Sequence, residues 1–379
     1  MQIAGRERLL PTTMVGNYPN PTWYMDQPWA VFPDAAGALP MRARPGVPAA
    51  SEIGSRSREA FYDAVAAIVH DQEEAGLDVI ADGRVYGGSS AYGQILYHYY
   101  ERLSGFELPR GSDFVSPRCT GPVSLRAPLH TETLAAVRRA TDRPVKISYT
   151  GLQVLTLFAK DEFYGAQREL GTALAAALNE DFRRLADAGV DIIQIDEFLW
   201  SHGVSDWEIE LLNRAVAGVN VQFWVHVCRT ASTRPRPLLV SGGRHGFKRY
   251  VLGDDPSGVE DEDEPTGPLA ALWPTVLDAD VQVLNAEALD TADLAALRDS
   301  PWPGDVVAGV IDVRTEQVET VSEVAARIRA VLDVVPAKRL GLTTSCGLVK
   351  LNRDVARAKL DALVAGAALV RAEIKADVA

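Results

Sequence analysis

Short apolar runs alternate along the chain with longer stretches in which apolar residues recur at helical spacing. The clearest helical stretches are 170–189 and 354–374. Eight of the short runs have the length and β-branched content of buried strands. They are residues 12–17, 78–83, 145–151, 191–197, 221–228, 281–287, 306–313 and 339–347. Strands that alternate with helices indicate a parallel sheet, and eight such units predict an α/β fold of the (β/α)8 TIM-barrel type.

We expect residues 1–379 to form one barrel domain that carries two insertions. Residues 105–126 form a loop or hairpin between the second and third units by this interpretation. Residues 229–272 are rich in proline, glycine and acidic side chains, a composition typical of loops rather than helices. We expect the acidic run in this second insertion to be a solvated surface, with a functional lid as the alternative.

Composition narrows the class of protein. Acidic residues outnumber basic ones by 51 to 38, so the formal charge of -13 disfavours nucleic acid as a partner. No apolar run approaches the roughly 18 residues that a membrane span needs, and the N-terminus lacks an apolar signal segment. We therefore expect a cytoplasmic protein with no membrane partner. The three cysteines are too few for a disulfide framework and should be free thiols, and a homo-oligomer stays open.

Several predicted strands end in residues that can ligate a metal or transfer a proton, and a TIM barrel places its chemistry at these ends. The residues are Asp196, Glu197, His226, Cys228, Glu287, Asp312 and Cys346. His226 and Cys228 are two positions apart on one strand and therefore face the same side. Together with Cys346, and with Glu287 as a candidate fourth ligand, they predict a tetrahedral zinc site, because thiolates select a softer metal than magnesium or calcium.

Each of these residues also has a structural interpretation. A cysteine on a buried strand is usually a small hydrophobic residue, and a lone histidine there is usually hydrogen-bonded in the core. Cys119 is interpreted in this way, since it follows no clear strand end. The coincidence of His226, Cys228 and Cys346 at the ends of two predicted strands favours the metal.

The same strand ends carry a resemblance to a known family. The motifs QIDE, VHVC, LNAE, GVIDVRT and TTSCGL occur in the order found in the zinc-binding catalytic barrel of the cobalamin-independent methionine synthases. PTTMVGNYPNP resembles the opening strand of that barrel, so the resemblance runs from Leu10 to about Arg371. Within this superfamily, NYPNPTWYMDQPW is most similar to the epoxyalkane:coenzyme M transferases, or 2-hydroxypropyl-CoM lyases. The resemblance implies zinc ligation by His226, Cys228 and Cys346, with Glu287 where the synthases supply a carboxylate.

One departure from the methionine synthases bears on the substrate. Those enzymes carry a glutamate after the second strand that helps to hold the ammonium group of homocysteine, whereas LDVIADGRVYGG places Arg84 there. A cation cannot receive an ammonium group but can pair with the sulfonate of coenzyme M. The alternative is a solvent-exposed loop arginine. We expect Arg84, Asn17 and Tyr18 to bind substrate.

The implied reaction is the opening of a short aliphatic epoxide by coenzyme M, giving a 2-hydroxyalkyl thioether. Zinc with an exchangeable position would generate the thiolate, which is the reactive form of a thiol. We expect Asp196 and Glu197 to be catalytic, with Asp196 orienting the substrate, a ligand or a water molecule. The proton donor to the opened ring stays open among Tyr18, His202 and His245.

Three rival interpretations remain. A short methionine synthase would use the same barrel and zinc with a methyl donor, and Arg84 argues against it. A non-catalytic zinc-binding barrel would normally close its site with four Cys or His ligands. A metal-free barrel related to uroporphyrinogen decarboxylase would leave Cys228 and Cys346 without a role.

Overall fold

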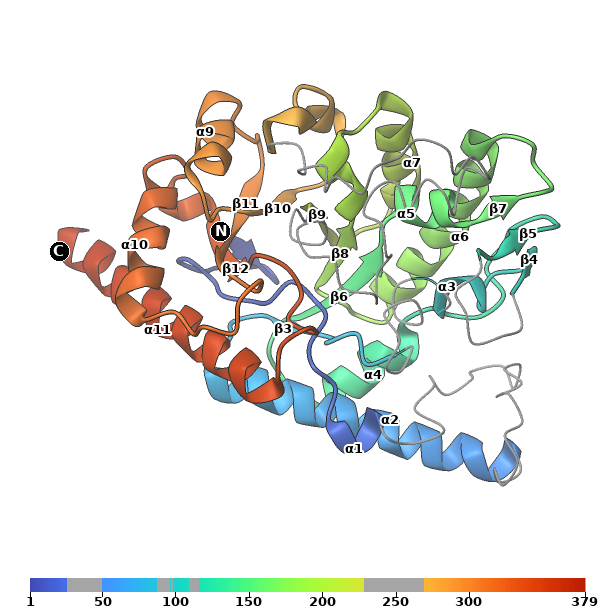
Figure 1. Cartoon of the computed structure of the whole chain (residues 1–379), viewed down its shortest axis with the longest axis horizontal. Helices are drawn as coiled ribbons and strands as arrows, with labels where there is room; N and C mark the ends of the chain where they lie inside the picture. The colour runs from blue at the N-terminus through green and yellow to red at the C-terminus, as the bar shows by residue number, and fades with distance from the viewer. Residues whose placement is uncertain (26–49, 87–95, 97, 109–115, 228–268, 379) are drawn as a thin grey trace, which may run out of the picture.

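The structure is a computed structural model that describes residues 1–25, 50–86, 96, 98–108, 116–227 and 269–378. Its centre is a sheet of seven parallel strands whose spatial order follows the chain (Figure 1). The strands are β3 (Ile80–Ala81), β6 (Val145–Thr150), β8 (Ile192–Asp196), β9 (Gln222–Val227), β10 (Val283–Glu287), β11 (Asp305–Ile311) and β12 (Leu340–Thr344). Each coincides with one of the strands that the sequence predicts.

The remaining predicted strand, at the start of the chain, closes the sheet. Thr12 pairs in parallel with Leu342. Thr13 N donates to Leu342 O at 3.0 Å, and Leu342 N donates to Pro11 O at 2.8 Å. On the other side, the backbone N–H groups of Asp78 and Val79 donate to Thr12 O at 3.0 and 3.1 Å. The opening segment therefore lies between β12 and β3, and the predicted TIM barrel is confirmed.

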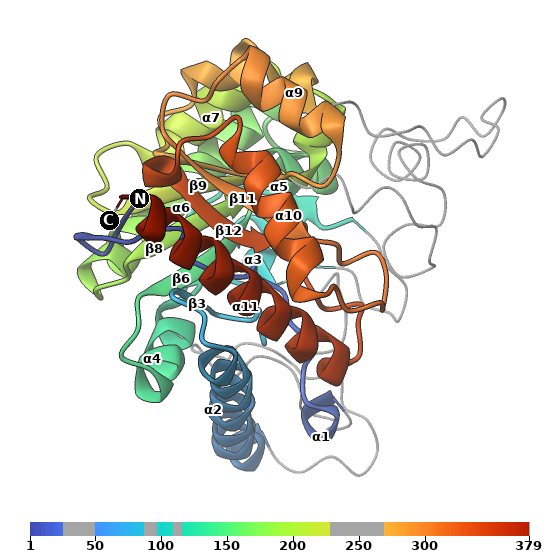
Figure 2. The ribbon, with the colours of Figure 1, turned by 90° about the vertical axis from the view of Figure 1, so that its left-hand side faces the viewer.

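Helices surround the sheet, as Figure 2 shows for α2, α4, α10 and α11. The longer ones are α2 (Ala50–Ala75), α4 (Thr131–Ala140), α6 (Gln167–Asp187), α7 (Asp206–Val216), α9 (Thr291–Asp299), α10 (Val321–Leu332) and α11 (Arg353–Val378). Short helical turns are α1 (Thr22–Met25), α3 (His98–Tyr100), α5 (Leu152–Phe158), η2 (Phe198–His202), η4 (Leu269–Leu272), η5 (Thr275–Asp278) and η6 (Ala337–Arg339). The helices predicted over 170–189 and 354–374 are confirmed as α6 and α11. No helix in the described part of the chain combines the length and apolar character that a bilayer crossing requires.

The amino ends of the barrel strands enclose an apolar plug. Strands β1 (Gln2–Ile3) and β2 (Arg6–Glu7) pair antiparallel at the N-terminus. Met1 and Ile3 join a separate buried cluster with barrel residues, whose other members are Val79, Ile192, Trp224, Val283 and Val307. This end of the barrel is therefore filled by side chains rather than open to solvent.

Above the plug the interior becomes polar. Lys146 on β6 is fully buried, and its ammonium donates to Met14 O at 2.6 Å, to Val15 O at 3.0 Å and to Gln194 Oε1 at 2.6 Å. Asn285 Nδ2 on β10 donates to the same Gln194 oxygen at 3.0 Å. Desolvation lowers the pKa of Lys146 to about 7, against the pull of nearby carboxylates. This network ties the opening segment to three barrel strands and supports the residues above it.

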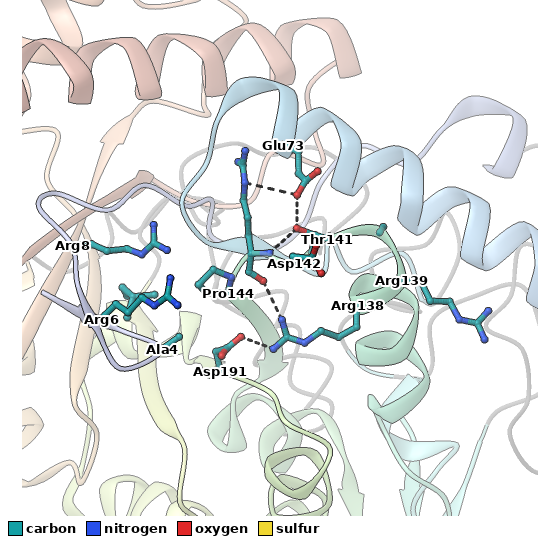
Figure 3. A pocket seen from close by; sticks show the side chains of 13 residues that line it. Ala4, Arg6, Arg8, Glu73, Arg138, Arg139, Thr141, Asp142, Pro144 and Asp191 are labelled. Carbon is teal, nitrogen blue, oxygen red and sulfur yellow. Dashed lines mark hydrogen bonds and ion pairs between the residues drawn. The ribbon is translucent and has the colours of Figure 1, made fainter.

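Arginines hold the loops at the amino end of the barrel. A cleft of about 670 Å³ lies there, lined in part by Arg6, Arg8, Arg138, Arg139 and Arg143, of which Figure 3 labels the first four. Arg138 donates to Arg143 O and Gly189 O and pairs with Asp191 at 2.5 Å. Arg143 donates to Leu77 O at 2.6 Å. These carbonyls follow the carboxyl ends of α2, α4 and α6, where backbone acceptors lack helical partners. The cleft is thus part of the scaffold.

The first predicted insertion contains two short strands that pair with each other. Strand β4 (Phe106–Glu107) pairs antiparallel with β5 (Arg118–Cys119), which pairs in parallel with β7 (Lys160–Asp161). Cys119 is fully buried in this small sheet, as a packing cysteine would be. Residues 229–268 of the second insertion lie outside the described residues, and its last four residues form η4, with Leu269 and Leu272 buried.

Candidate active site

Parallel pairing brings several of the sequence-predicted residues to the carboxyl ends of adjacent strands. Asp196, the last residue of β8, stands opposite His226 on β9. Glu287 ends β10, which pairs with β9. All three side chains are buried. Cys228 lies outside the described residues, directly beyond β9.

The ring of His226 is held by a backbone carbonyl. Its Nδ1 lies 3.2 Å from Asn285 O on the neighbouring strand, and the side chain is 1% exposed. A proton on Nδ1 would make this contact a hydrogen bond and would leave the lone pair of Nε2 as the ligating atom. This arrangement of an oriented imidazole is the one that metal-binding histidines use.

A glycine on β11, Gly309, leaves room for the backbone that follows β12. Gly309 pairs with Glu287 on one side and with Thr343 on the other. A Cβ at Gly309 would lie 2.7 Å from Ser345 Cα and 2.9 Å from Thr344 O. The backbone that leads to Cys346 therefore occupies the position that a β11 side chain would otherwise fill.

The segment around Cys346 packs against the opening motif. Cys346 is a partly exposed free cysteine, and its carbonyl accepts from Thr344 Oγ1 at 2.7 Å. Leu348 N donates to Asn17 O at 2.7 Å, and a Cβ on Gly347 would approach Asn17 Cβ to 2.9 Å. Asn17 and the two residues that follow Cys346 are thus brought together from opposite ends of the chain.

The donor set suits zinc. The described residues contain no group of three or more His, Cys, Asp or Glu side chains placed to hold a metal, and the expected set of ligands includes Cys228, which falls outside them. The described members of that set are an oriented imidazole, a thiol and a carboxyl. These are ligand types that zinc takes in proteins.

Arg84 forms a buried ion pair with Asp196 at the candidate site. Its Nη2 lies 2.5 Å from Asp196 Oδ2, and its Nη1 lies 3.4 Å from Thr150 Oγ1. The arginine is 2% exposed and has a positive φ of 50°, a conformation that non-glycine residues rarely adopt. Burial alone would lower the pKa of Arg84, but the carboxylate of Asp196 holds it well above its ordinary value. The guanidinium is therefore a permanent cation in the site.

The other oxygen of Asp196 is also engaged. Gln194 Nε2 donates to Asp196 Oδ1 at 2.7 Å and to Val15 O at 2.7 Å. Gly16 lies close to Ser148 of β6, because a Cβ at Gly16 would lie 2.9 Å from Ser148 Oγ. The carboxylate is thus fixed from two sides, by an amide and a guanidinium.

Glu197 turns away from this ion pair. Its Oε1 accepts from Leu152 N at 2.6 Å and from Gln153 N at 3.3 Å, and so it binds the first backbone N–H groups of α5. Gly151 makes this possible, since a Cβ there would lie 2.2 Å from Glu197 Oε2. Desolvation raises the pKa of Glu197 to about 8, although both hydrogen bonds lower it. Its described contacts are those of a helix-capping acid beside the site.

The hydroxyl of Tyr18 also makes a hydrogen bond outside the ion pair of Arg84 and Asp196. It donates to Asp71 Oδ2 on α2 at 3.2 Å, and Arg353 of α11 pairs with the same oxygen at 2.6 Å. Burial and the charge of Asp71 raise the pKa of Tyr18 well above its usual range. Of the other two proton-donor candidates, the side chain of His202 and all of His245 lie outside the described residues.

Asp82 is a buried acid that our selection of strand-end residues omitted. It follows β3, is 1% exposed, and accepts from Ser148 N at 3.3 Å through Oδ1. Its Oδ2 has no hydrogen-bond partner in the described part of the chain. Desolvation raises the pKa of Asp82 to about 7, and Arg84 opposes this most strongly. The sequence did hold a signal, because the second predicted strand ends in Asp82 and Gly83.

The fold and these strand-end residues define a methionine synthase-like barrel, and comparison with protein families agrees. The family model described as the catalytic domain of cobalamin-independent synthase matches residues 32–232 and 274–369. The chain belongs to this family of enzymes.

The chain is also similar to particular proteins over nearly its whole length. The chain is 39% identical to the 2-hydroxypropyl-CoM lyase of Xanthobacter autotrophicus over 99% of this chain and 98% of that protein. It is 28% identical to the methionine synthase of Saccharolobus solfataricus, over 97% and 96% of the two chains. Among solved structures, a B12-independent methionine synthase from a Shewanella species, in complex with selenomethionine, matches with a TM-score of 0.75 and 27% identity, covering 97% of this chain and all of that one.

Proposed function

We propose that this enzyme adds coenzyme M to a short aliphatic epoxide, with zinc bound by His226, Cys228 and Cys346 and with Glu287 beside it. The relative at 39% identity carries the name of such an activity. The methionine synthase of Saccharolobus solfataricus, at 28% identity, supplies the alternative.

The ion pair between Arg84 and Asp196 is the observation that carries the proposal. A guanidinium has five N–H donors, and Asp196 accepts from one of them at 2.5 Å. Nε of Arg84 is buried without a hydrogen-bond partner among the described residues. A sulfonate that contacts this guanidinium would gain charge-assisted hydrogen bonds. The ammonium group of homocysteine would be repelled by Arg84 instead. The carboxylate of Asp196, which could otherwise bind it, is already paired with Arg84.

The remaining residues orient the reactants. Bound zinc supplies a lowered thiol pKa at the site, so that the thiol of coenzyme M reacts as a thiolate. Asn285 orients His226 through its carbonyl, and Gln194 with Arg84 fixes both oxygens of Asp196. The sulfur then forms a bond to a ring carbon while the carbon–oxygen bond breaks and its electron pair moves to oxygen.

An apolar pocket distinguishes one methylene more or less by about 1 to 3 kcal/mol, so we expect several small epoxides to be accepted.

An assay with two arms tests the function. Purified protein is incubated with coenzyme M and epoxypropane, and loss of thiol and formation of the thioether are followed. A parallel arm contains homocysteine and methyltetrahydrofolate. Thioether formation in the first arm alone supports the proposal, whereas methionine formation without consumption of epoxide identifies a methionine synthase. Silence in both arms would support a non-catalytic zinc-binding barrel.

A further inference from the structure

The opened epoxide needs a proton, and two buried acids at the described site, Asp82 and Glu197, each have one oxygen without a hydrogen-bond partner among the described residues. Glu197 binds the first backbone N–H groups of α5 through its other oxygen, whereas Asp82 lies two residues from Arg84. Asp82 stands at the end of β3, two residues before Arg84, and is 1% exposed. Oδ1 receives the N–H of Ser148 at 3.3 Å, which places the carboxyl beside β6. Oδ2 is shielded from solvent and has no hydrogen-bond partner among the described residues.

Asp82 lies close to the charged groups of the proposed sulfonate site. The groups whose charges shift the pKa of Asp82 are Arg84, Asp196 and Lys146, which lie after the end of β3, at the end of β8 and within β6. Asp82 and Arg84 follow the same strand, so a thiol anchored on Arg84 would bring the epoxide to this sector of the barrel.

We propose that Asp82 is the catalytic residue that donates a proton to the epoxide oxygen, an inference that rests on the proposed function. As the carbon–sulfur bond forms and the carbon–oxygen bond breaks, the oxygen takes the electron pair and the proton of the Asp82 carboxyl. Water then reprotonates Asp82. The proton that the thiol loses on forming its thiolate enters solvent, so no net proton is consumed.

The protonation behaviour of Asp82 agrees with this role. Desolvation holds its pKa at about 7, so a substantial fraction carries the proton at neutral pH. A general acid is most effective when its pKa lies near the working pH. Tyr18, by contrast, already donates its hydroxyl proton to Asp71.

Two electrophiles separate proton donation from a structural role. Epoxypropane leaves an oxygen that needs a proton, whereas bromoethane releases bromide and needs none. Asp82→Asn keeps an oxygen that can accept from Ser148 N and removes the acidic proton. Asp181→Asn is the matched control, because Asp181 is another buried carboxyl, with a pKa that desolvation raises to about 6, and it contacts Tyr149 and Leu129 outside the site.

We expect Asp82→Asn to lower kcat for coenzyme M and epoxypropane by about 100-fold or more, and to change the rate with bromoethane by less than about threefold. The wild-type kcat with epoxypropane should fall as the pH rises through about 7, and the variant should lack this fall. Asp181→Asn should behave like wild type in all these measurements.

The outcomes are distinct. If wild type opens the epoxide and Asp82→Asn does so equally well, or keeps the same fall with pH, Asp82 is not the donor while the proposed function stands. Equal losses with epoxypropane and bromoethane would make Asp82 a structural residue and overturn the inference. If wild type shows no turnover of epoxide at any pH, the proposed function fails and this inference fails with it.

Discussion

The guanidinium of Arg84 lies 2.5 Å from the carboxylate of Asp196, although 112 residues separate them in the chain. Arg84 follows β3 and reaches past the end of β6, where Thr150 lies 3.4 Å from its Nη1, to the end of β8. The pair therefore spans three adjacent strands at the end of the barrel where TIM-barrel enzymes carry out chemistry.

Replacing Arg84 with alanine should weaken the binding of coenzyme M. The loss of a charged contact worth roughly 1 to 3 kcal/mol would raise the KM for the thiol by about 5- to 150-fold and leave the KM for the epoxide nearly unchanged. Steady-state kinetics with each substrate varied in turn measures both constants. Arg168→Ala, which removes an exposed arginine of α6, serves as the control. An unchanged thiol KM would move the sulfonate contact to another residue.

The same change should alter which thiols are accepted. Without Arg84, the carboxylate of Asp196 is free to receive an ammonium group, so cysteamine, which carries an amine where coenzyme M has a sulfonate, should gain activity relative to coenzyme M. The ratio of kcat/KM values for the two thiols measures this. Adding Asp196→Asn to Arg84→Ala should abolish the gain, and a gain that survives in the double variant would contradict the explanation.

Metal content tests the ligand set directly. Purified protein should hold about one zinc per chain, and Cys346→Ala or Cys228→Ala should release it and abolish turnover while the barrel stays folded. Elemental analysis, circular dichroism and the coenzyme M assay report on the three effects. Cys119→Ala is the matched control, since that thiol is buried in the hairpin sheet. Full activity after exhaustive chelation would rule the zinc site out.

Gly151 should be sensitive to a single methyl group. A Cβ there would lie 2.2 Å from Glu197 Oε2, within a buried contact that begins α5. We expect Gly151→Ala to lower the free energy of unfolding by about 1 to 3 kcal/mol, as overpacking of a buried site typically does. Gly121→Ala, where the nearest atom would be 3.7 Å from the new Cβ, should be nearly neutral. Urea denaturation of both variants gives the comparison.

Asp181 should make stability depend on pH. Desolvation raises its folded-state pKa to about 6 from the ordinary 3.8, so the folded state binds the proton more tightly than the unfolded chain does. Its contribution to stability is therefore fully present below about pH 4 and is lost as the pH rises through about 6. Comparison of urea denaturation of wild type and Asp181→Asn between pH 4 and 7 should show the variant without this loss. Parallel curves for the two proteins would contradict it.

Much of the architecture could be read from the chain, because strand and helix leave different periods in the apolar residues. Six of the seven sheet strands fall within the predicted runs and β11 begins one residue before its run, and α6 and α11 overlap the two stretches where helical spacing was clearest. The period of two also predicted that His226 and Cys228 face the same side of one strand, and the ends of parallel strands placed Asp196 and Glu287 beside His226.

Closure of the barrel by its opening segment needed the tertiary structure. Residues 11–15 meet β12 and the start of β3 mostly through backbone hydrogen bonds, and these are nearly independent of side-chain identity. A run of apolar residues indicates a strand but does not name its two neighbours.

The sequence by itself determined which kinds of side chain end the strands, since residue type and position along a strand are local properties. Only the tertiary structure decided what each of them contacts. Arg84 pairs with Asp196, Glu197 binds the first turn of α5, and Tyr18 donates to Asp71. The reason is physical: periodicity fixes the face on which a side chain leaves the backbone, whereas its partner depends on rotamers and on segments that only the folded chain brings within a few ångströms.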